Sequence, residues 1–359
     1  MPCECAGASL LTWSVSAFLN QFPATDPGGI LELRDRQFAA ELIAVAMLHL
    51  DLFTWLEANP GWNAAAVSGH FSIKERPTDV MLTLCQSYGF VTGHPGAIHL
   101  TAMGREHLVK GSPWFLGPYF VPVRDTPVVR GFLDVLKTGK PGNWQAKSDG
   151  KDWHQSMLDP EFAREFTELM NSRGLIFGQA LARALAPLLG GRRTLLDVGG
   201  GSGIYSSALV AHHPQLSATV LEQVPVDAIT RAEIARHGLE GKVDVLTADM
   251  FANDWPPSDI ILLSNVLHDW GFPEVRLLLE KAATALGPGG LLVIHDAFIR
   301  DDKSGPVAVA EYSALLMNIT QGKCYTPAEL GNLLEEAGFS AGPYQDTVAR
   351  RGFMTAMKV

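Results

Sequence analysis

The sequence predicts an α/β protein that combines a doubly wound, mostly parallel sheet with a mainly helical N-terminal domain. The apolar run Thr194–Val198 breaks into Gly-Gly-Gly-Ser-Gly at 199–203, and a helix-compatible segment follows, which is typical of a strand, a tight turn and a helix. Apolar runs and helical segments then alternate to the end of the chain. The 359 residues are many for one domain and sufficient for two.

The first 110 residues predict a helical domain with a winged-helix-like pattern. Apolar residues recur at helical spacing from Arg34 to Leu56 and nearly surround one expected helix, which indicates deep burial. Ala64–Val67 and residues 77–88 form a helix-turn-helix pattern around a break at 68–70. Residues 89–101 contain two short β-like runs around a Gly/Pro turn. A helix that is apolar on all sides suggests a partner subunit that covers it, so we expect a homodimer.

The middle of the chain is less regular. Residues 111–153 are rich in Gly, Pro and aromatic residues, which favours either irregular packing between domains or one wall of a ligand pocket. A helix is expected from about residue 160 to 189, directly before the glycine turn.

The elements after the glycine turn complete the predicted sheet. The expected strands are Ala218–Leu221, Val243–Thr247, Asp259–Ser264, Leu291–His295 and, closing the sheet, Phe353–Met357. The third of these has no polar alternation, which indicates a strand buried on both faces. A helix over residues 272–286 is stopped by the glycine-rich run 287–290, and Thr326 with Glu329 predicts a capped start for a helix that ends near Gly338.

The glycine turn indicates a ligand of the nucleotide type. Its glycines allow positive φ and close approach of a ligand to the backbone. A dinucleotide fingerprint would need its last glycine where Ile204 or Ser206 stands, and a P-loop would need a lysine that is absent between Arg193 and Gly241. What remains is Asp-x-Gly-x-Gly-x-Gly, with Glu222 about twenty residues further on, where a ribose diol would lie.

Other strand ends carry suitable side chains. In such a sheet the carboxyl ends of the strands hold the ligand, so Glu222, Asp249, Met250 and the segment 264–270 should converge. Glu222 can accept hydrogen bonds from two hydroxyls, Asp249 can accept from an exocyclic adenine amine, and Met250 offers apolar area to a ring face.

Four segments together resemble the class I S-adenosylmethionine-dependent O-methyltransferases of the caffeate and antibiotic-tailoring type. These segments are Leu-Leu-Asp-Val-Gly-Gly-Gly-Ser-Gly, Ala-Asp-Met-Phe, Ser-Asn-Val-Leu-His-Asp-Trp and Leu-Gly-Pro-Gly-Gly-Leu-Leu-Val-Ile. The resemblance covers nearly the whole chain. It implies S-adenosylmethionine as cofactor, with S-adenosylhomocysteine as product and no metal, and contacts to the cofactor from Gly199, Gly201, Glu222, Asp249, Met250 and Ser264.

The resemblance also implies a division of the chain. We expect a winged-helix-like dimerisation domain at 1–110, a linker region that contributes to the acceptor pocket at 111–185, and a class I methyltransferase, Rossmann-like catalytic domain at 186–359. In this family the His of Leu-His-Asp-Trp is the general base, which here is His268, and Asp296 matches an acidic residue that orients it. Asp269 is expected to be a turn residue.

The sequence departs from the plant members of the family at two places. Cys324 stands where they have a second acidic residue beside the base, and Ser264 replaces a lysine, as in bacterial members. A neutral Cys324 would stabilise a charged His268 less, so it marks either weaker base catalysis or an acceptor that needs less of it. A structural cysteine that fills an apolar gap is the other interpretation.

The acceptor stays open. We expect a small molecule with an aromatic or phenolic hydroxyl, because such a group must lose a proton that His268 could remove. The alternatives are an S-methyltransferase with a thiol or thioether acceptor and a C-methyltransferase. A more distant alternative is a winged-helix DNA-binding regulator, although the expected recognition helix carries only Lys74 and Arg76 at its start and then Asp79.

Composition limits the partners and the compartment. The net charge of −10 and the pI near 5.5 disfavour nucleic acid or an anionic membrane as main partner. No apolar run reaches membrane-spanning length and no signal-peptide pattern begins the sequence. The four scattered cysteines, two of them Cys3 and Cys5, favour a reducing compartment, so we expect a cytoplasmic protein.

Overall fold

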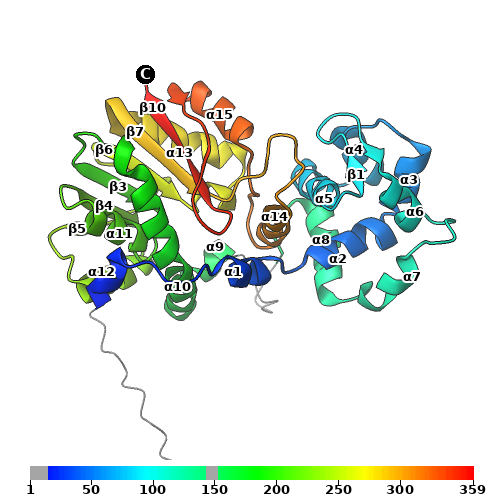
Figure 1. Ribbon diagram of the computed structural model, residues 1–359, viewed down its shortest axis with the longest axis horizontal. Helices are drawn as coiled ribbons and strands as arrows, with labels where there is room; N and C mark the ends of the chain where they lie inside the picture. Colours follow the sequence, from blue (N-terminus) through cyan, green and yellow to red (C-terminus); the bar gives the residue numbers. More distant parts are fainter. Residues whose placement is uncertain (1–14, 143–152) are drawn as a thin grey trace, which may run out of the picture.

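The computed structural model describes residues 15–142 and 153–359, which form a helical part and a sheet-containing part with helix α14 (Val307–Ile319) between them (Figure 1). Cys3 and Cys5 lie outside the described residues.

The sheet is doubly wound, as predicted. Its strand order is β5-β4-β3-β6-β7-β10-β8, and β9 pairs with β10. Strands β3 to β7 are parallel, whereas β10 is antiparallel to β7 and β8. The bounds are β3 (Thr194–Val198), β4 (Ser217–Glu222), β5 (Val243–Thr247), β6 (Ser258–Ser264), β7 (Leu286–Asp296), β8 (Phe339–Ala341), β9 (Gln345–Asp346) and β10 (Gly352–Lys358). Thus β7 begins before Leu291, and β8 lies outside β10 at the edge.

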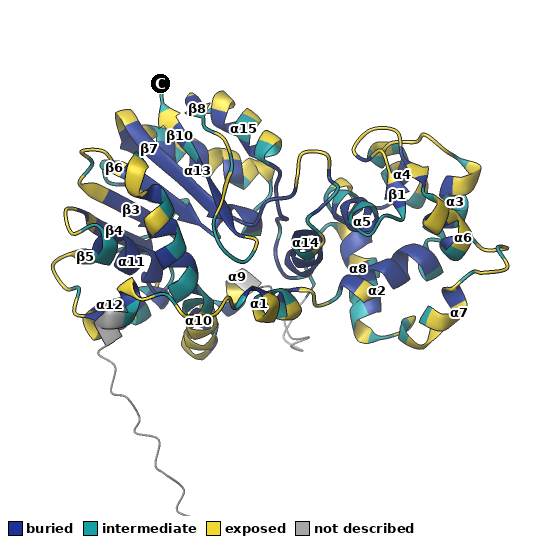
Figure 2. Ribbon diagram, in the orientation of Figure 1, coloured by how far each residue is buried: buried dark blue, intermediate teal, exposed yellow. Residues whose placement is uncertain are grey.

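Helices cover both faces of the sheet, and its central strands are buried (Figure 2). Leu195 packs with α10 (Pro160–Leu185), α11 (Ile204–His212) and α12 (Val226–His237). Its neighbour Leu196 packs on the other face with α13 (Phe272–Ala285) and α15 (Pro327–Glu336). Successive side chains of a strand point to opposite faces, so an unbroken apolar run is what this position requires. The expected capping box of Thr326 and Glu329 begins α15.

The helical part contains short elements. They are α2 (Ala39–Ala44), the π-helical η2 (Val45–His49), α3 (Leu52–Ala58), α4 (Ala64–Phe71), α5 (Glu75–Ser87), β1 (Val91–Thr92), β2 (His99–Leu100), α6 (Ala102–Leu108), α7 (Gly117–Phe120), η3 (Val121–Val123) and α8 (Pro127–Thr138). Before them in the chain, η1 (Val15–Asn20) packs against α10, α11 and α12 of the sheet-containing part, and α1 (Gly28–Asp35) lies against α14. Short elements α9 (Trp153–Ser156) and η5 (Ala186–Leu188) flank α10.

The single helix predicted from Arg34 to Leu56 is wrong. The chain leaves the helical conformation at Phe38 (φ 73°) and at Asp51 (φ 52°), which separates α1, α2 with η2, and α3. Helical spacing continues from Phe38 across the break at Asp51 because α2, η2 and α3 all turn apolar side chains toward the same core.

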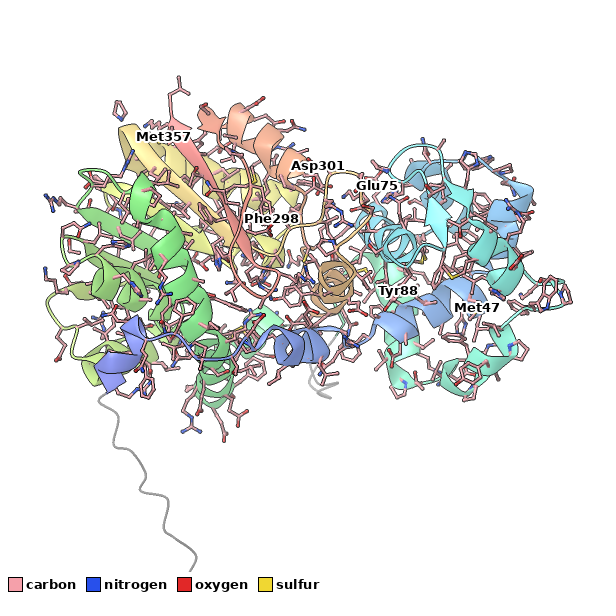
Figure 3. All side chains as sticks on the ribbon, viewed as in Figure 1. Met47, Glu75, Tyr88, Phe298, Asp301 and Met357 are labelled. Carbon is pink, nitrogen blue, oxygen red and sulfur yellow. The ribbon has the colours of Figure 1, made fainter. Side chains whose placement is uncertain are left out.

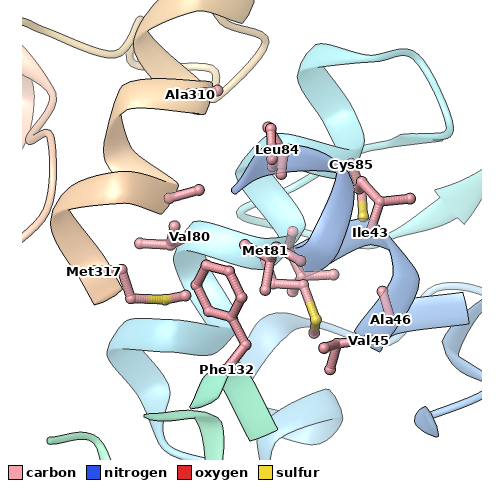
Figure 4. Packing of buried hydrophobic residues seen from close by; sticks show 14 of the residues in the cluster. Ile43, Val45, Ala46, Val80, Met81, Leu84, Cys85, Phe132, Ala310 and Met317 are labelled. Atoms are coloured by element: carbon pink, nitrogen blue, oxygen red, sulfur yellow. The ribbon is translucent and has the colours of Figure 1, made fainter. Parts of the chain in front are cut away.

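The same segment is covered by its own chain. Ile43, Val45 and Ala46 are buried against Met81 of α5 and a wider set from α8 and α14, in which Figure 4 labels Phe132, Ala310 and Met317. Burial within one chain removes the apolar helix as a reason to expect a partner. The homodimer therefore stays a prediction from the family resemblance.

The winged-helix-like pattern is present with a shifted break. Helix α4 continues to Phe71, and the turn lies at Ser72, which has a φ of 52°. Strands β1 and β2 form the expected small antiparallel hairpin. Helix α5, which a DNA reader would expose, is buried along most of its length against α14 and α8.

Two connections tie α5 to α14. The hydroxyl of Tyr88, labelled in Figure 3, donates to Oε1 of Glu311 at 2.5 Å. The guanidinium of Arg76 donates to the carbonyl oxygens of Met317, Thr320 and Gly322, and also to that of Gly139. The helical core therefore includes α8 and α14, which lie beyond residue 110. The division at residues 110 and 185 stays a proposal.

Among the described residues, no single helix is long and apolar enough to span a membrane. The consecutive helical segments Ala39–His49 and Leu52–Ala58 reach that length and apolar composition only when taken together, and they are bent by 54° at the break between them.

We predict that Arg76→Met lowers the free energy of unfolding by about 3 kcal/mol, because it leaves several partly buried carbonyl oxygens without a donor. Arg130→Met is the control, since this exposed arginine has only a 3.9 Å ion pair with exposed Asp125 and its loss should cost less than about 0.5 kcal/mol. Urea unfolding measures both. Equal stability of the two variants would show that the Arg76 bonds contribute nothing.

Candidate functional site

A cavity of about 520 Å³ lies at the carboxyl ends of β3 to β6. The cavity is lined by every residue that was predicted to contact the cofactor: Gly199, Gly201, Glu222, Asp249, Met250 and Ser264. His268 also lines it, and Asp296 lies directly behind His268. The structure thus brings all the predicted site residues together, as the rule for parallel sheets requires.

The glycine turn forms the floor at the end of β3. Gly199 and Gly201 have φ of 65° and 58°, a region that other residues rarely adopt. A Cβ at Gly199 would lie 3.2 Å from Val266 and 3.8 Å from Sδ of Met250, whereas one at Gly201 would meet nothing within 4 Å. The turn therefore leaves backbone open to a ligand.

The carboxylate of Glu222 is held at the end of β4. Oε1 accepts from the backbone N–H of Gly201 at 2.9 Å, and Oε2 accepts from that of Gln223 at 3.0 Å. Burial raises the pKa of Glu222 to about 7, although these two hydrogen bonds oppose the shift. Two carboxylate oxygens still offer further lone pairs to hydroxyl donors.

Asp249 and Met250 follow β5. Oδ1 of Asp249 accepts from the backbone N–H of Phe251 at 2.8 Å and of Ala252 at 3.3 Å, so this side chain both shapes the turn and borders the cavity. Met250 is half-buried and places its thioether near the glycine turn.

Ser264 belongs to a polar group beneath the cavity. Its Oγ lies 2.9 Å from Nδ1 of His295, and Nδ2 of Asn265 donates to it at 3.2 Å. Burial lowers the pKa of His295 to about 3, so this imidazole is neutral. Asn265 has a φ of 54° and also donates to the hydroxyl of Tyr205 at 2.9 Å.

His268 sits in the short turn η6 (Leu267–Asp269), directly after β6, and is buried. Its Nδ1 lies 2.5 Å from Oδ1 of Asp296, which also accepts from the backbone N–H of Ala297 at 2.7 Å. Burial lowers the pKa of His268, but the charges of Asp296 and Asp269 outweigh it and raise the pKa above its ordinary value. The hydrogen bond to Nδ1 leaves Nε2 for a ligand.

Asp269 does more than shape a turn, contrary to expectation. Its Oδ1 lies 3.6 Å from Nε2 of His268, and the residue lines the cavity. Burial raises the pKa of Asp269 to about 6. His268 therefore has a carboxylate near each of its two ring nitrogens. The neutral residue at position 324 does not reduce the number of carboxylates beside the imidazole to one.

Cys324 is a packing residue. It is buried in the helical core, does not line the cavity, and burial raises the pKa of its thiol well above the ordinary value. The adjacent segment instead supports His268 from behind: a Cβ at Gly322 would lie 2.1 Å from the carbonyl oxygen of His268.

Several cavity residues were not predicted from the sequence, among them Arg173, Tyr205 and Tyr312. Nη1 of Arg173 donates to the hydroxyl of Tyr312 at 3.3 Å, and the Tyr312 ring meets the His268 ring edge-on with centroids 5.7 Å apart. A charged residue within an amphipathic helix gives no sequence signal that separates a cavity wall from a solvated face. The aromatic residues of 111–153 that the structure describes do not line the cavity. Side chains from the following segment do, namely Met157, Phe166, Thr167, Leu169, Met170, Ser172 and Arg173.

Comparisons with known proteins identify the family to which this chain belongs. Residues 132–340 match the model of the O-methyltransferase domain. The chain is 32% identical over 299 residues to 3-hydroxy-5-methyl-1-naphthoate 3-O-methyltransferase of Streptomyces sahachiroi, covering 82% of this chain and 84% of the relative. It is 28% identical over 308 residues to L-tyrosine C(3)-methyltransferase of Streptomyces lavendulae, covering 84% and 83%.

A solved structure agrees over nearly the full length. The O-methyltransferase family 2 protein of Planctomyces limnophilus, in complex with apigenin, has a TM-score of 0.82 and 28% identity, covering 95% of this chain and 98% of that protein. The chain is thus an S-adenosylmethionine-dependent methyltransferase. More narrowly, the chain belongs to the O-methyltransferase family, which decides for an enzyme over a DNA-binding regulator.

We predict that Glu222→Gln weakens binding of S-adenosylhomocysteine by about 1–3 kcal/mol, because an amide accepts hydroxyl hydrogen bonds less strongly than a carboxylate. Wild-type affinity should strengthen as the pH rises through about 7, where Glu222 ionises. Calorimetry measures both effects. Asp244→Asn, at an exposed carboxylate on β5, is the control, and a Glu222→Gln variant that binds like this control would exclude the contact.

We predict that Asp296→Asn lowers the pKa of His268, since it removes a negative charge that raises it. NMR titration of labelled histidine, with the signal assigned by its loss in His268→Gln, gives the midpoint, which should lie above 6.5 in the wild type. Asp254→Asn, at an exposed carboxylate, should leave the midpoint in place. An unchanged midpoint in Asp296→Asn would contradict the pairing.

Proposed function

We propose that this chain methylates a hydroxyl oxygen of a small aromatic acceptor and that His268 is the general base. The observation that carries the proposal is the placement of His268: its ring lines the cavity that the glycine turn and Glu222 also line, while Asp296 holds the opposite side of the ring.

The cavity residues fit the cofactor. When bound, S-adenosylmethionine supplies an electrophilic methyl group on a positively charged sulfur. Glu222 would hold the ribose hydroxyls, Asp249 the adenine amine, and Met250 one face of the adenine ring. Gly199 and Gly201 allow close approach, since any Cβ at these two positions would project from strained backbone.

His268 must be neutral to accept a proton. A phenolic hydroxyl has an unperturbed pKa of about 10, and removing its proton makes the oxygen a stronger nucleophile. The Asp296 carboxylate fixes the ring and stabilises the imidazolium once the proton has moved to Nε2. Asp269, at 3.6 Å from Nε2, adds to this stabilisation.

The cavity walls suit a flat apolar acceptor. Side chains from α1, α10 and α14 line it, among them Leu31, Met170, Leu315, Leu316 and Ile319. The Streptomyces sahachiroi relative is named for 3-O-methylation of a hydroxynaphthoate, which supports an aromatic hydroxyl here.

Methylation at carbon is the second candidate, favoured by the relative named for C(3)-methylation of L-tyrosine. Removing the phenolic proton also raises the electron density of neighbouring ring carbons, so the same base would serve either outcome.

We predict that His268→Ala lowers kcat by about two to four orders of magnitude. In the wild type, kcat/KM should rise with pH through a pKa above 6.5, because neutral imidazole is the active form and the folded protein raises the pKa of His268. Transfer from labelled S-adenosylmethionine to a panel of phenols measures both.

His99→Ala is the matched control, since His99 is exposed on the hairpin of the helical part. A His268→Ala variant that keeps the rate of this control would refute base catalysis at His268.

A further inference from the structure

Arg173 presents a cationic group to the cavity without an ion-pair partner among the described residues. Its guanidinium carries five N–H donors. In the described part of the chain it forms no ion pair, and its hydrogen bond goes to the neutral hydroxyl of Tyr312 at 3.3 Å. Its Cζ lies 5.8 Å from the centroid of the Tyr312 ring and 5.9 Å from that of Phe177.

Among the described residues, the buried cations Arg351, Lys303 and Lys323 pair with carboxylates, whereas the partly buried Arg76 donates to four backbone carbonyl oxygens. Arg351 donates to Asp35 at 3.2 Å, and it lies against the same two rings as Arg173. Lys303 and Lys323 share two carboxylates, those of Asp79 and Glu329. A partly enclosed guanidinium without an anion is costly, so its retention in a cavity wall points to an anionic ligand.

The surroundings of Arg173 are cationic. Arg34, on α1, lines the same cavity and lies 3.7 Å from Asp35, the carboxylate that also pairs with Arg351. Asp35 is thus already within ion-pair distance of two guanidinium groups, those of Arg34 and Arg351, and its charge also acts on Arg173 at longer range. The opposite charge lies at the base, where Asp269 and Asp296 flank His268.

We propose that Arg173 forms a carboxylate-binding subsite of this cavity. The role of this subsite in turnover rests on the proposed function. Tyr312 links Arg173 to His268, so an aromatic acceptor that places its hydroxyl at His268 can place a carboxylate at Arg173. The acceptor class that follows is a hydroxyaromatic carboxylic acid.

The methionyl end of S-adenosylmethionine is a second source of the same chemistry. The turn of α10 that carries Arg173 also lies against the glycine turn: Oδ1 of Asn171 accepts from Oγ of Ser202 at 2.9 Å, and a Cβ at Gly174 would lie 2.5 Å from Ile204. Both sources present a carboxylate to one guanidinium, and they can be separated by experiment.

The test compares Arg173→Met and Arg173→Lys with Arg164→Met, whose arginine is exposed on the same helix. Calorimetry on the intact chain uses two matched pairs of probes. The first pair is 3-hydroxy-2-naphthoic acid and 2-naphthol, which lacks the carboxylate, added to protein saturated with S-adenosylhomocysteine. The second pair is S-adenosylhomocysteine and 5′-methylthioadenosine, which lacks the amino-acid end.

If the acceptor supplies the carboxylate, Arg173→Met weakens the binding of hydroxynaphthoic acid about 10- to 100-fold. The affinity for 2-naphthol then changes less than threefold, and the affinity for S-adenosylhomocysteine is unchanged. If the cofactor supplies it, the same loss falls on S-adenosylhomocysteine and spares 5′-methylthioadenosine. In both cases Arg173→Lys recovers part of the affinity, because it keeps the charge.

The proposal is overturned if Arg173→Met binds all four probes as Arg164→Met does. Equal thermal unfolding of the two variants establishes that any loss is local. Because binding is measured without methyl transfer, this result is independent of which atom is methylated and of whether His268 is the base.

Discussion

The burial of α14 on all sides is the constraint on which the rest of the structure depends. One side of this helix, with Val309, Ala310 and Met317, completes the core of the helical part, while Tyr312 and Leu316 line the cavity. A helix that is apolar all round is stable only when it is covered on every side. The helical part and the sheet therefore share one element, and the wall of the cavity that α14 supplies forms only when both are in place. Hydrogen bonds from Arg76 to the carbonyl oxygen of Gly322 and from Tyr88 to Glu311 connect α5 to α14 and the segment after it.

This arrangement explains why the charges gather as they do. The loops that follow parallel strands leave polar side chains at one edge, where Glu222 and the His268–Asp296 pair lie. Helices α1 and α10 bring arginines to the other side of the same cavity. Burial raises the pKa of Glu222 to about 7, and the charges of Asp296 and Asp269 raise that of His268 against the effect of burial, so protonation near neutral pH governs both predicted contacts.

The sequence predicts the sheet and its ligand edge well, because strand periodicity and turn glycines are local signals. The predicted cofactor residues and His268 line the cavity for that reason, and Asp296 lies directly behind His268. Prediction from the sequence fails where tertiary packing decides the backbone conformation. Phe38 and Asp51 adopt left-handed φ values and so break a segment whose apolar spacing is unbroken. Asp269 follows His268 in the sequence, but only the fold brings its carboxylate to 3.6 Å from Nε2 of His268. The contact of Arg173 with Tyr312 likewise exists only in the fold. Cys324 likewise shows its packing role only by its burial.

The central claim is that the cavity directs methyl transfer to a hydroxyl oxygen beside His268. The most direct measurement is to supply the full chain with S-adenosylmethionine carrying a 13C-methyl group and hydroxyaromatic acceptors, and to locate the label by NMR. The account predicts a labelled methoxy carbon on an aromatic ring. A label on a ring carbon or on sulfur, with none on oxygen, would contradict it.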